Sequence, residues 1–264
     1  MNYLKTSTAA AGVIAYGLFA NVAGAVPVVI DDFTDSQTVV QTGVGSTTDI
    51  ETGAGGAIGG ERDVELTVTG GTLDSRVRVN FAGSGRFSLS NADGVTSTVL
   101  LQWDGVDGSS ALDATTGLGG IDLTDSGSNL GIGIMVLSND LLLTSEIRIY
   151  SSATDFTTHV FEKGIVDSSG SITPGDPTDD APFLHFAPFL TFAADIGAGA
   201  GTVGGSGADF TSVTAIELFI SGPASIDLAL DFVTSTDVPE PATLALLGMG
   251  LAGLGFARRR RTAK

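Results

Sequence analysis

The sequence lacks cysteine altogether and has little positive charge away from its two ends. Without cysteine, a disulfide framework and a thiol nucleophile are both excluded, so stability must come from a packed core, with bound metal as an addition. Six of the twelve basic residues lie in the first 25 and the last 27 positions, so the segment between keeps six basic residues against 29 acidic ones, a net charge of −23. Such a surface repels nucleic acid phosphates and anionic lipid, which argues against both as partners of the body.

Strong helix formers and aromatic residues are also scarce. The chain has 37 glycines and only 7% aromatic residues, which argues against a helical body and leaves few rings to wall a catalytic pocket. A Gly-x-Ser-x-Gly elbow and a phosphate-binding loop are absent, and neither His159 nor His185 has the neighbours of a zinc motif. A pair of catalytic carboxylates stays open among so many aspartates. The sequence nevertheless favours a protein that is not an enzyme.

The N-terminus has the pattern of a secretory signal peptide. Lys5 supplies a positive charge, residues 9–20 are apolar or small, and Ala23-Gly24-Ala25 fits the small-x-small cleavage pattern. We therefore predict a signal peptide over residues 1–25, cleavage after Ala25 and a mature chain that begins at Val26. An uncleaved N-terminal anchor is the alternative, but the run is short and rich in alanine for a membrane span.

Three segments with different physical properties follow one another at the C-terminus. Two prolines fix a short extended spacer, because each lacks a backbone N–H and has a fixed φ. Residues 242–257 carry no charge and would form an apolar helix of about 24 Å, somewhat short of the ~30 Å hydrocarbon core. A terminal arginine cluster predicts a stop-transfer signal with its cationic end in the cytoplasm. The spacer is Val238, Pro239, Glu240 and Pro241, and the cluster is Arg258, Arg259, Arg260 and Arg261.

This tail, residues 238–264, resembles the PEP-CTERM sorting tail of Gram-negative bacteria. The resemblance implies export to the cell envelope, cell surface or extracellular space, and processing near Pro-Glu-Pro by an exosortase, a membrane protease. It also implies an association with exopolysaccharide and biofilm. An ordinary C-terminal membrane anchor and a buried helix are the alternatives, although a buried helix seldom ends in four arginines.

The body, residues 26–237, has the length of one domain and the pattern of short strands. Val64, Leu66 and Val68 alternate with polar residues, which is the period of a half-buried strand. About ten such segments are separated by turn residues, whereas residues 43–60 read as a loop. Residues 183–192, with Pro188, read as an edge strand or two short strands. The last two segments, 216–220 and 226–232, read as a hairpin that turns at 221–223.

We therefore predict an all-β, jelly-roll-like β-sandwich, flanked by the signal peptide and the C-terminal hydrophobic helix. The order of segments is similar to jelly rolls of the galactose-binding and carbohydrate-binding-module type, with Asp-Asp-Phe opening the body and Ile-Asp-Leu-Ala-Leu-Asp-Phe closing it. The resemblance implies that the first and last strands lie close and hold a structural calcium ion. Asp31, Asp32 and Asp231 are the candidate ligands, and plain solvated carboxylates are the alternative.

Two further residues have open interpretations. Trp103, the only tryptophan, is a candidate sugar-stacking platform, although a lone tryptophan in a β-sandwich is more often part of the core. Arg62 reads as one partner of a surface or edge ion pair.

Four hypotheses about function follow. The leading one is a surface or matrix protein that binds polysaccharide, and a purely structural matrix protein stays open beside it. The alternatives are a glycan hydrolase or lyase, and an ice- or surface-binding protein, since tails of this kind also occur on ice-binding proteins. The last would use threonines on a flat face, of which the sequence offers Thr67, Thr69, Thr96 and Thr98.

Overall fold

The body folds into two antiparallel sheets. The computed structural model describes residues 26–163, 184–189 and 201–236, so the predicted signal peptide and sorting tail lie outside the described residues. Sheet A has the order β11 (Leu184–Pro188), β8 (Gly131–Asn139), β14 (Asp227–Thr236), β6 (Phe87–Asn91), β5 (Asp74–Val79) and β2 (Gln37–Thr42), with β1 (Val28–Asp31) also paired to β14. Sheet B has the order β12 (Val203–Gly204), β10 (Phe156–Lys163), β9 (Leu143–Tyr150), β13 (Ala215–Gly222), β7 (Thr96–Trp103), β4 (Glu61–Gly70) and β3 (Gly45–Thr52).

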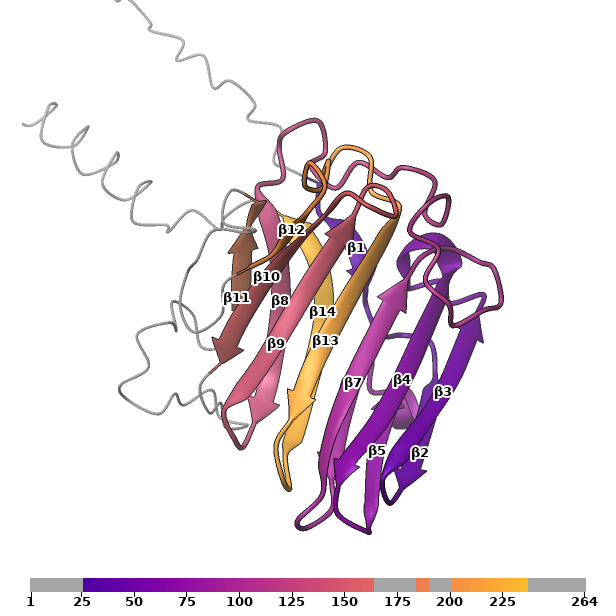
Figure 1. Cartoon of the computed structure of the whole chain (residues 1–264), viewed down its shortest axis with the longest axis vertical. Coiled ribbons are helices and arrows are strands. Elements are labelled where there is room, and N and C mark those ends of the chain that lie inside the picture. Colours follow the sequence, from indigo (N-terminus) through magenta and orange to yellow (C-terminus); the bar gives the residue numbers. More distant parts are fainter. Residues whose placement is uncertain (1–25, 164–183, 190–200, 237–264) are drawn as a thin grey trace, which may run out of the picture.

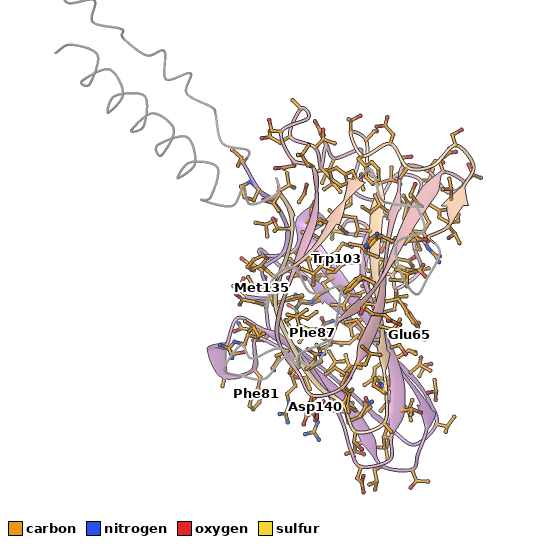
Figure 2. All side chains as sticks on the ribbon, turned by 90° about the vertical axis from the view of Figure 1, so that its left-hand side faces the viewer. Glu65, Phe81, Phe87, Trp103, Met135 and Asp140 are labelled. Carbon is orange, nitrogen blue, oxygen red and sulfur yellow. The ribbon has the colours of Figure 1, made fainter. Side chains whose placement is uncertain are left out.

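The two sheets form the layers of a sandwich around one apolar core (Figure 1). The alternation read from the sequence explains this: Val64, Leu66 and Val68 are fully buried, and the residues between them face outward. Figure 2 shows Trp103 and Phe87 between the layers, and Glu65 on the outer side of sheet B. The predicted all-β sandwich is confirmed.

The last two strands of the body do not pair with each other, so the predicted hairpin is wrong. β13 pairs with β7 and β9 in sheet B, whereas β14 pairs with β6, β8 and β1 in sheet A. The chain crosses between the sheets at residues 223–226, where Ser225 has a positive φ of 67° and Ile226 is fully buried. Two half-buried strands satisfy the same alternating pattern whether they pair in one sheet or face each other across the core. β4 and β5 also lie in different sheets.

The predictions for two segments, one rich in glycine and one with a proline, compare differently with the structure. Residues 43–60, read as a loop, contain the edge strand β3, which pairs with β4 over its whole length. The prediction was wrong because threonine favours strands and an edge strand needs apolar residues on neither face. The predicted edge strand around Pro188 is confirmed, since β11 ends at Pro188 and lies at the edge of sheet A.

The first and last strands of the body are neighbours, as the jelly-roll resemblance implies. Val28 and Val29 pair with Ser235 and Thr234, and a register irregularity then places Asp31 opposite Val233. The long connection between β7 and β8, residues 104–130, lies at one end of the sandwich (Figure 1). Two short 3-10 turns complete the described elements, at Ile58–Gly60 (η1) and Phe81–Gly83 (η2).

Candidate functional site

A buried ion pair joins β1 to β4 inside the sandwich. The guanidinium of Arg62 donates through one nitrogen to both carboxylate oxygens of Asp31, at 3.1 and 3.0 Å, and neither side chain is exposed. The indole N–H of Trp103 donates to the same carboxylate at 2.9 Å, and the backbone N–H of Phe33 donates to it at 2.8 Å. Burial raises the pKa of Asp31, and the charge of Arg62 and the indole N–H oppose that rise.

This network corrects two interpretations of the sequence. Trp103 is 0% exposed, so it is a core residue and a sugar cannot stack on it. Arg62 is also 0% exposed, so its ion pair is internal rather than at a surface or edge. Its remaining nitrogens are satisfied as well: Nε donates to Gln37 Oε1 at 2.9 Å, and the second terminal nitrogen donates to the carbonyl of Asp35 at 2.8 Å. The network stabilises the position of the first strand against sheet B.

The three candidate calcium ligands are held in different ways. Both oxygens of Asp31 are occupied by the network described above, and Asp32 accepts hydrogen bonds from the backbone and hydroxyl of Thr34 at 3.1 and 2.6 Å. Asp231 lies on β14, partly buried. Within the three described stretches of the chain, no three acidic or histidine side chains are grouped so that they could hold a metal ion. These observations give a calcium site at the three residues no support, and it stays a prediction.

A second set of carboxylates lies near the same end of sheet B. Asp63 on β4 is 3% exposed, and neither of its oxygens has a hydrogen-bond partner among the described residues. Burial, together with the charges of Asp104, Glu61 and Asp107, raises the pKa of Asp63 to about 7. Glu61 accepts from the backbone of Gly108 at 3.1 Å. Since Asp63 and Asp104 are at most 3% exposed, a polymer cannot reach them.

The outer face of sheet B carries an open groove across its central strands. Its volume is about 310 Å³, and strand register explains its lining. Phe219 on β13 lies directly opposite Leu100 of β7 on one side and Glu146 of β9 on the other. Two residues along the same strands, and on the same face, Glu217 on β13 lies opposite Arg148 on β9. Phe219 is 40% exposed, so an aromatic ring lies in the groove, accessible from solvent.

A hydrogen-bond network fixes the polar side chains of this groove. Arg148 donates to Glu146 Oε1 at 2.7 Å and to the phenolic oxygen of Tyr150 at 3.2 Å. The hydroxyl of Tyr150 donates to Glu217 Oε2 at 2.7 Å. Burial and the hydrogen bond to Glu217 raise the pKa of Tyr150 to about 12, so the phenol stays protonated and keeps donating. The guanidinium also lies 5.3 Å from the centre of the Phe156 ring.

Sequence reasoning missed this groove as a site. Alternation placed Arg148, Glu217 and Phe219 on strands, and it also indicates that they face away from the core. It does not indicate that β9, β13 and β7 are neighbours, and only this adjacency brings the residues together.

The hydrogen-bond network of the groove leaves one buried polar atom unsatisfied. Arg148 Nε has no hydrogen-bond partner among the described residues.

The fold and the tail together define an exported all-β sandwich protein. Residues 237–261 match the PEP-CTERM protein-sorting motif, which confirms the resemblance read from the sequence and implies export to the cell envelope or surface and processing by an exosortase. Among curated proteins no match is found. Within the described residues, no helix has the length and apolar character that a membrane crossing needs. The predicted helix over 242–257 lies outside those residues.

Two solved structures are similar to the chain. One is the family 11 carbohydrate-binding module from Clostridium thermocellum in complex with a β-1,3-1,4-mixed-linked tetrasaccharide, at 12% identity and a TM-score of 0.34, covering 81% of this chain and 98% of that one. The other is the family 11 module of a cellulosomal cellulase from the same organism, at 11% identity and a TM-score of 0.34, covering 80% and 95%. At these values the likeness does not bear on what this chain binds.

Proposed function

We propose that this exported protein binds an extended polysaccharide along the outer face of sheet B, without catalysis. The observation that carries the proposal is the groove in which the exposed ring of Phe219 lies beside the fixed groups of Arg148, Glu146 and Glu217. A sugar ring has an apolar face and a rim of hydroxyl groups, so a binding surface needs an apolar platform with polar groups held in place beside it. An open groove over several strands suits a polymer chain better than a small enclosed ligand.

The fixed polar groups make the groove ready to bind. Arg148, Glu146, Tyr150 and Glu217 already hold one another, so little side-chain freedom is lost when a ligand arrives.

Binding of neutral glucans to the purified full chain tests the proposal. We expect binding by isothermal calorimetry or glycan array, and Phe219→Ala should raise the Kd about tenfold or more, which corresponds to ~1.4 kcal/mol. Phe81→Ala is the matched control, since Phe81 is 59% exposed but lies by sheet A. Absence of any neutral-glycan binding, or equal loss in both variants, would refute the proposal. Release of reducing ends from the same glycans would indicate the glycan-active enzyme instead.

A row of hydroxyl groups supports the ice- or surface-binding alternative. Register aligns Ser46, Thr67, Thr98, Ser221 and Thr144 across five neighbouring strands of sheet B, at the ~4.8 Å strand spacing. The sequence offered only Thr67 and Thr98 of this row. Ser46 lies in the segment that was read as a loop, and Ser221 and Thr144 come from strands that are distant along the chain. A thermal-hysteresis assay tests this alternative. Hysteresis that Thr98→Val abolishes would favour it over polysaccharide binding.

Sorting and processing complete the proposed function. We infer that the signal peptide is removed after Ala25, that the exosortase acts near Pro239 and Pro241, and that the body then works at the cell surface or in the extracellular matrix, where it contributes to exopolysaccharide or biofilm. The tail motif supports the exosortase step, and the small-x-small pattern of Ala23-Gly24-Ala25 supports removal of the signal peptide. Intact-mass measurement of the protein from the envelope and from the medium tests where the chain is cut, and an uncut tail would contradict the processing step.

A further inference from the structure

Three of the six basic residues of this acidic body lie together on sheet A, in or beside β5 and β6. Of the other three, Arg62 is buried in its ion pair, Arg148 is tied to Glu146, and Lys163 lies on β10 in sheet B. Arg76 and Arg78 lie on β5, and Arg86 lies in the turn before β6. Within the described residues, Arg78 and Arg86 have no carboxylate at ion-pair distance, and Arg76 has only a long contact of 3.9 Å with Asp74.

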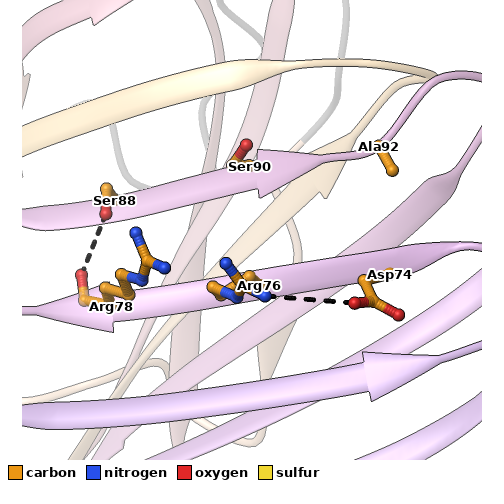
Figure 3. A pocket seen from close by; sticks show the side chains of 6 residues that line it. All are labelled: Asp74, Arg76, Arg78, Ser88, Ser90 and Ala92. Atoms are coloured by element: carbon orange, nitrogen blue, oxygen red, sulfur yellow. Dashed lines mark hydrogen bonds and ion pairs between the residues drawn. The ribbon is translucent and has the colours of Figure 1, made fainter.

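The register of β5 and β6 places Arg76 and Arg78 along one wall of a groove. Arg78 lies opposite Ser88 and Arg76 opposite Ser90, so two long side chains stand beside two short ones on the outer face of the sheet. The result is an open groove of about 270 Å³ (Figure 3). On the next strand, β14, Ala229 lies opposite Ser88 and the exposed Asp227 lies opposite Ser90, so the short side of the groove continues only beyond Ser88.

A strained turn holds one of the arginines in position. The guanidinium of Arg78 lies 4.4 Å from the centre of the Phe81 ring, which is 59% exposed. Phe81 stands in η2 between Asn80 and Ala82, which have positive φ values of 48° and 56°, a conformation that residues other than glycine seldom adopt. The backbone N–H of Asn80 donates to the carbonyl of Arg86 at 2.8 Å and closes this turn. The ring and the turn therefore orient Arg78 before any ligand binds.

We propose that this groove binds a polysaccharide that carries carboxylate groups. The guanidinium fork matches a carboxylate in a bidentate arrangement, and the two arginines, two residues apart on one strand face, have their Cα atoms ~6.7 Å apart along the groove. The hydroxyls of Ser88 and Ser90 line the opposite wall and can bond sugar hydroxyls. Asp74 at one end, Asp227 opposite Ser90 and the net charge of −23 of the body all repel anions, so attraction of carboxylates is confined to Arg76 and Arg78.

The groove is independent of the one on sheet B. The two lie on the outer faces of opposite sheets, so both can be occupied at once. One molecule would then hold a neutral chain on one face and an acidic chain on the other, and would link two polymers in a matrix.

Binding of polygalacturonate to the full chain at 0.1 M salt tests the proposal. The double variant Arg76→Gln/Arg78→Gln should raise the Kd at least tenfold, whereas Arg86→Gln, which removes an exposed charge outside the groove lining, should change it less than twofold. Neutral-glucan binding should be the same in all three proteins. Melting temperatures confirm that the variants are folded, since surface substitutions of this kind usually change stability by less than ~0.5 kcal/mol.

Absence of polygalacturonate binding by the native chain, or unchanged binding by the double variant, would overturn the proposal. The proposal would also fail if Arg86→Gln weakened binding as much as each charge removed in the double variant does, because that would indicate nonspecific attraction. The outcome is distinguishable from failure of the sheet B site, because that site is tested with neutral glucan and with Phe219→Ala. An intermediate Kd for Arg78→Lys would support recognition by the guanidinium fork, because lysine keeps the charge and loses the bidentate geometry.

Discussion

Replacing Asp63 with asparagine should stabilise this protein at neutral pH, although Asp63 is buried and polar. Its carboxylate has no hydrogen-bond partner among the described residues and is surrounded by the charges of Asp104, Glu61 and Asp107. These surroundings raise the pKa of Asp63 from 3.8 to about 7. Ionisation of Asp63 above that pH is therefore unfavourable in the folded state relative to the unfolded chain.

The size of the effect follows from the pKa. Each unit of difference between the folded and unfolded pKa is worth about 1.4 kcal/mol, so a rise of roughly three units sets an upper limit of about 4 kcal/mol. The folded state binds the extra proton between about pH 4 and pH 7, so the stability of the native protein falls as the pH rises through this window. Asparagine is uncharged and its amide still needs partners in the site, so we expect a net gain of about 1–3 kcal/mol at pH 8.

Urea unfolding of the full chain at pH 4 and pH 8 measures this. The stability gap between Asp63→Asn and the native protein should be large at pH 8 and much smaller at pH 4, where the carboxyl is protonated in the folded state and about half protonated in the unfolded chain. Asp93→Asn, at an exposed turn position, is the control and should show no such pH dependence of the gap. A variant that is less stable than the native protein at pH 8 would refute the reasoning, because Asp63 would then have a favourable partner in its ionised form.

Four further predictions concern the buried network, the chain start and metal. Asp31→Ala should destabilise the protein by about 3–5 kcal/mol in denaturant titrations, because it leaves Arg62 buried and unpaired, whereas Asp31→Ala combined with Arg62→Met should recover part of the loss. The fluorescence of Trp103 should be blue-shifted and resistant to iodide in the native state; ready quenching would contradict its burial. The N-terminal sequence of the exported protein should begin at Val26, and a chain that begins at Met1 would contradict cleavage. Calcium at the predicted site should raise Tm after EDTA treatment, and Asp231→Ala should abolish that rise.

The sequence could predict what depends on neighbours along the chain. The alternation of Val64, Leu66 and Val68 predicted a half-buried strand because side chains of a strand point to opposite faces in turn. The tail was recognised because its three parts are consecutive, and the motif match agrees with it. The hairpin at 221–223 failed because a short turn looks the same whether it joins strands of one sheet or crosses between sheets.

Only the tertiary structure decided which distant residues meet. Arg62 reads as a surface arginine in sequence, yet the pairing of β1 with β14 and of β4 with β7 encloses it with Asp31 and Trp103. Phe219 and Arg148 became parts of one groove because β13 and β9 are neighbours in sheet B. An alternating pattern fixes which face of a strand is buried, whereas the choice of partner strand depends on how all the strands share one core. The sequence by itself thus determined an exported β protein, and long-range strand pairing determined its surfaces.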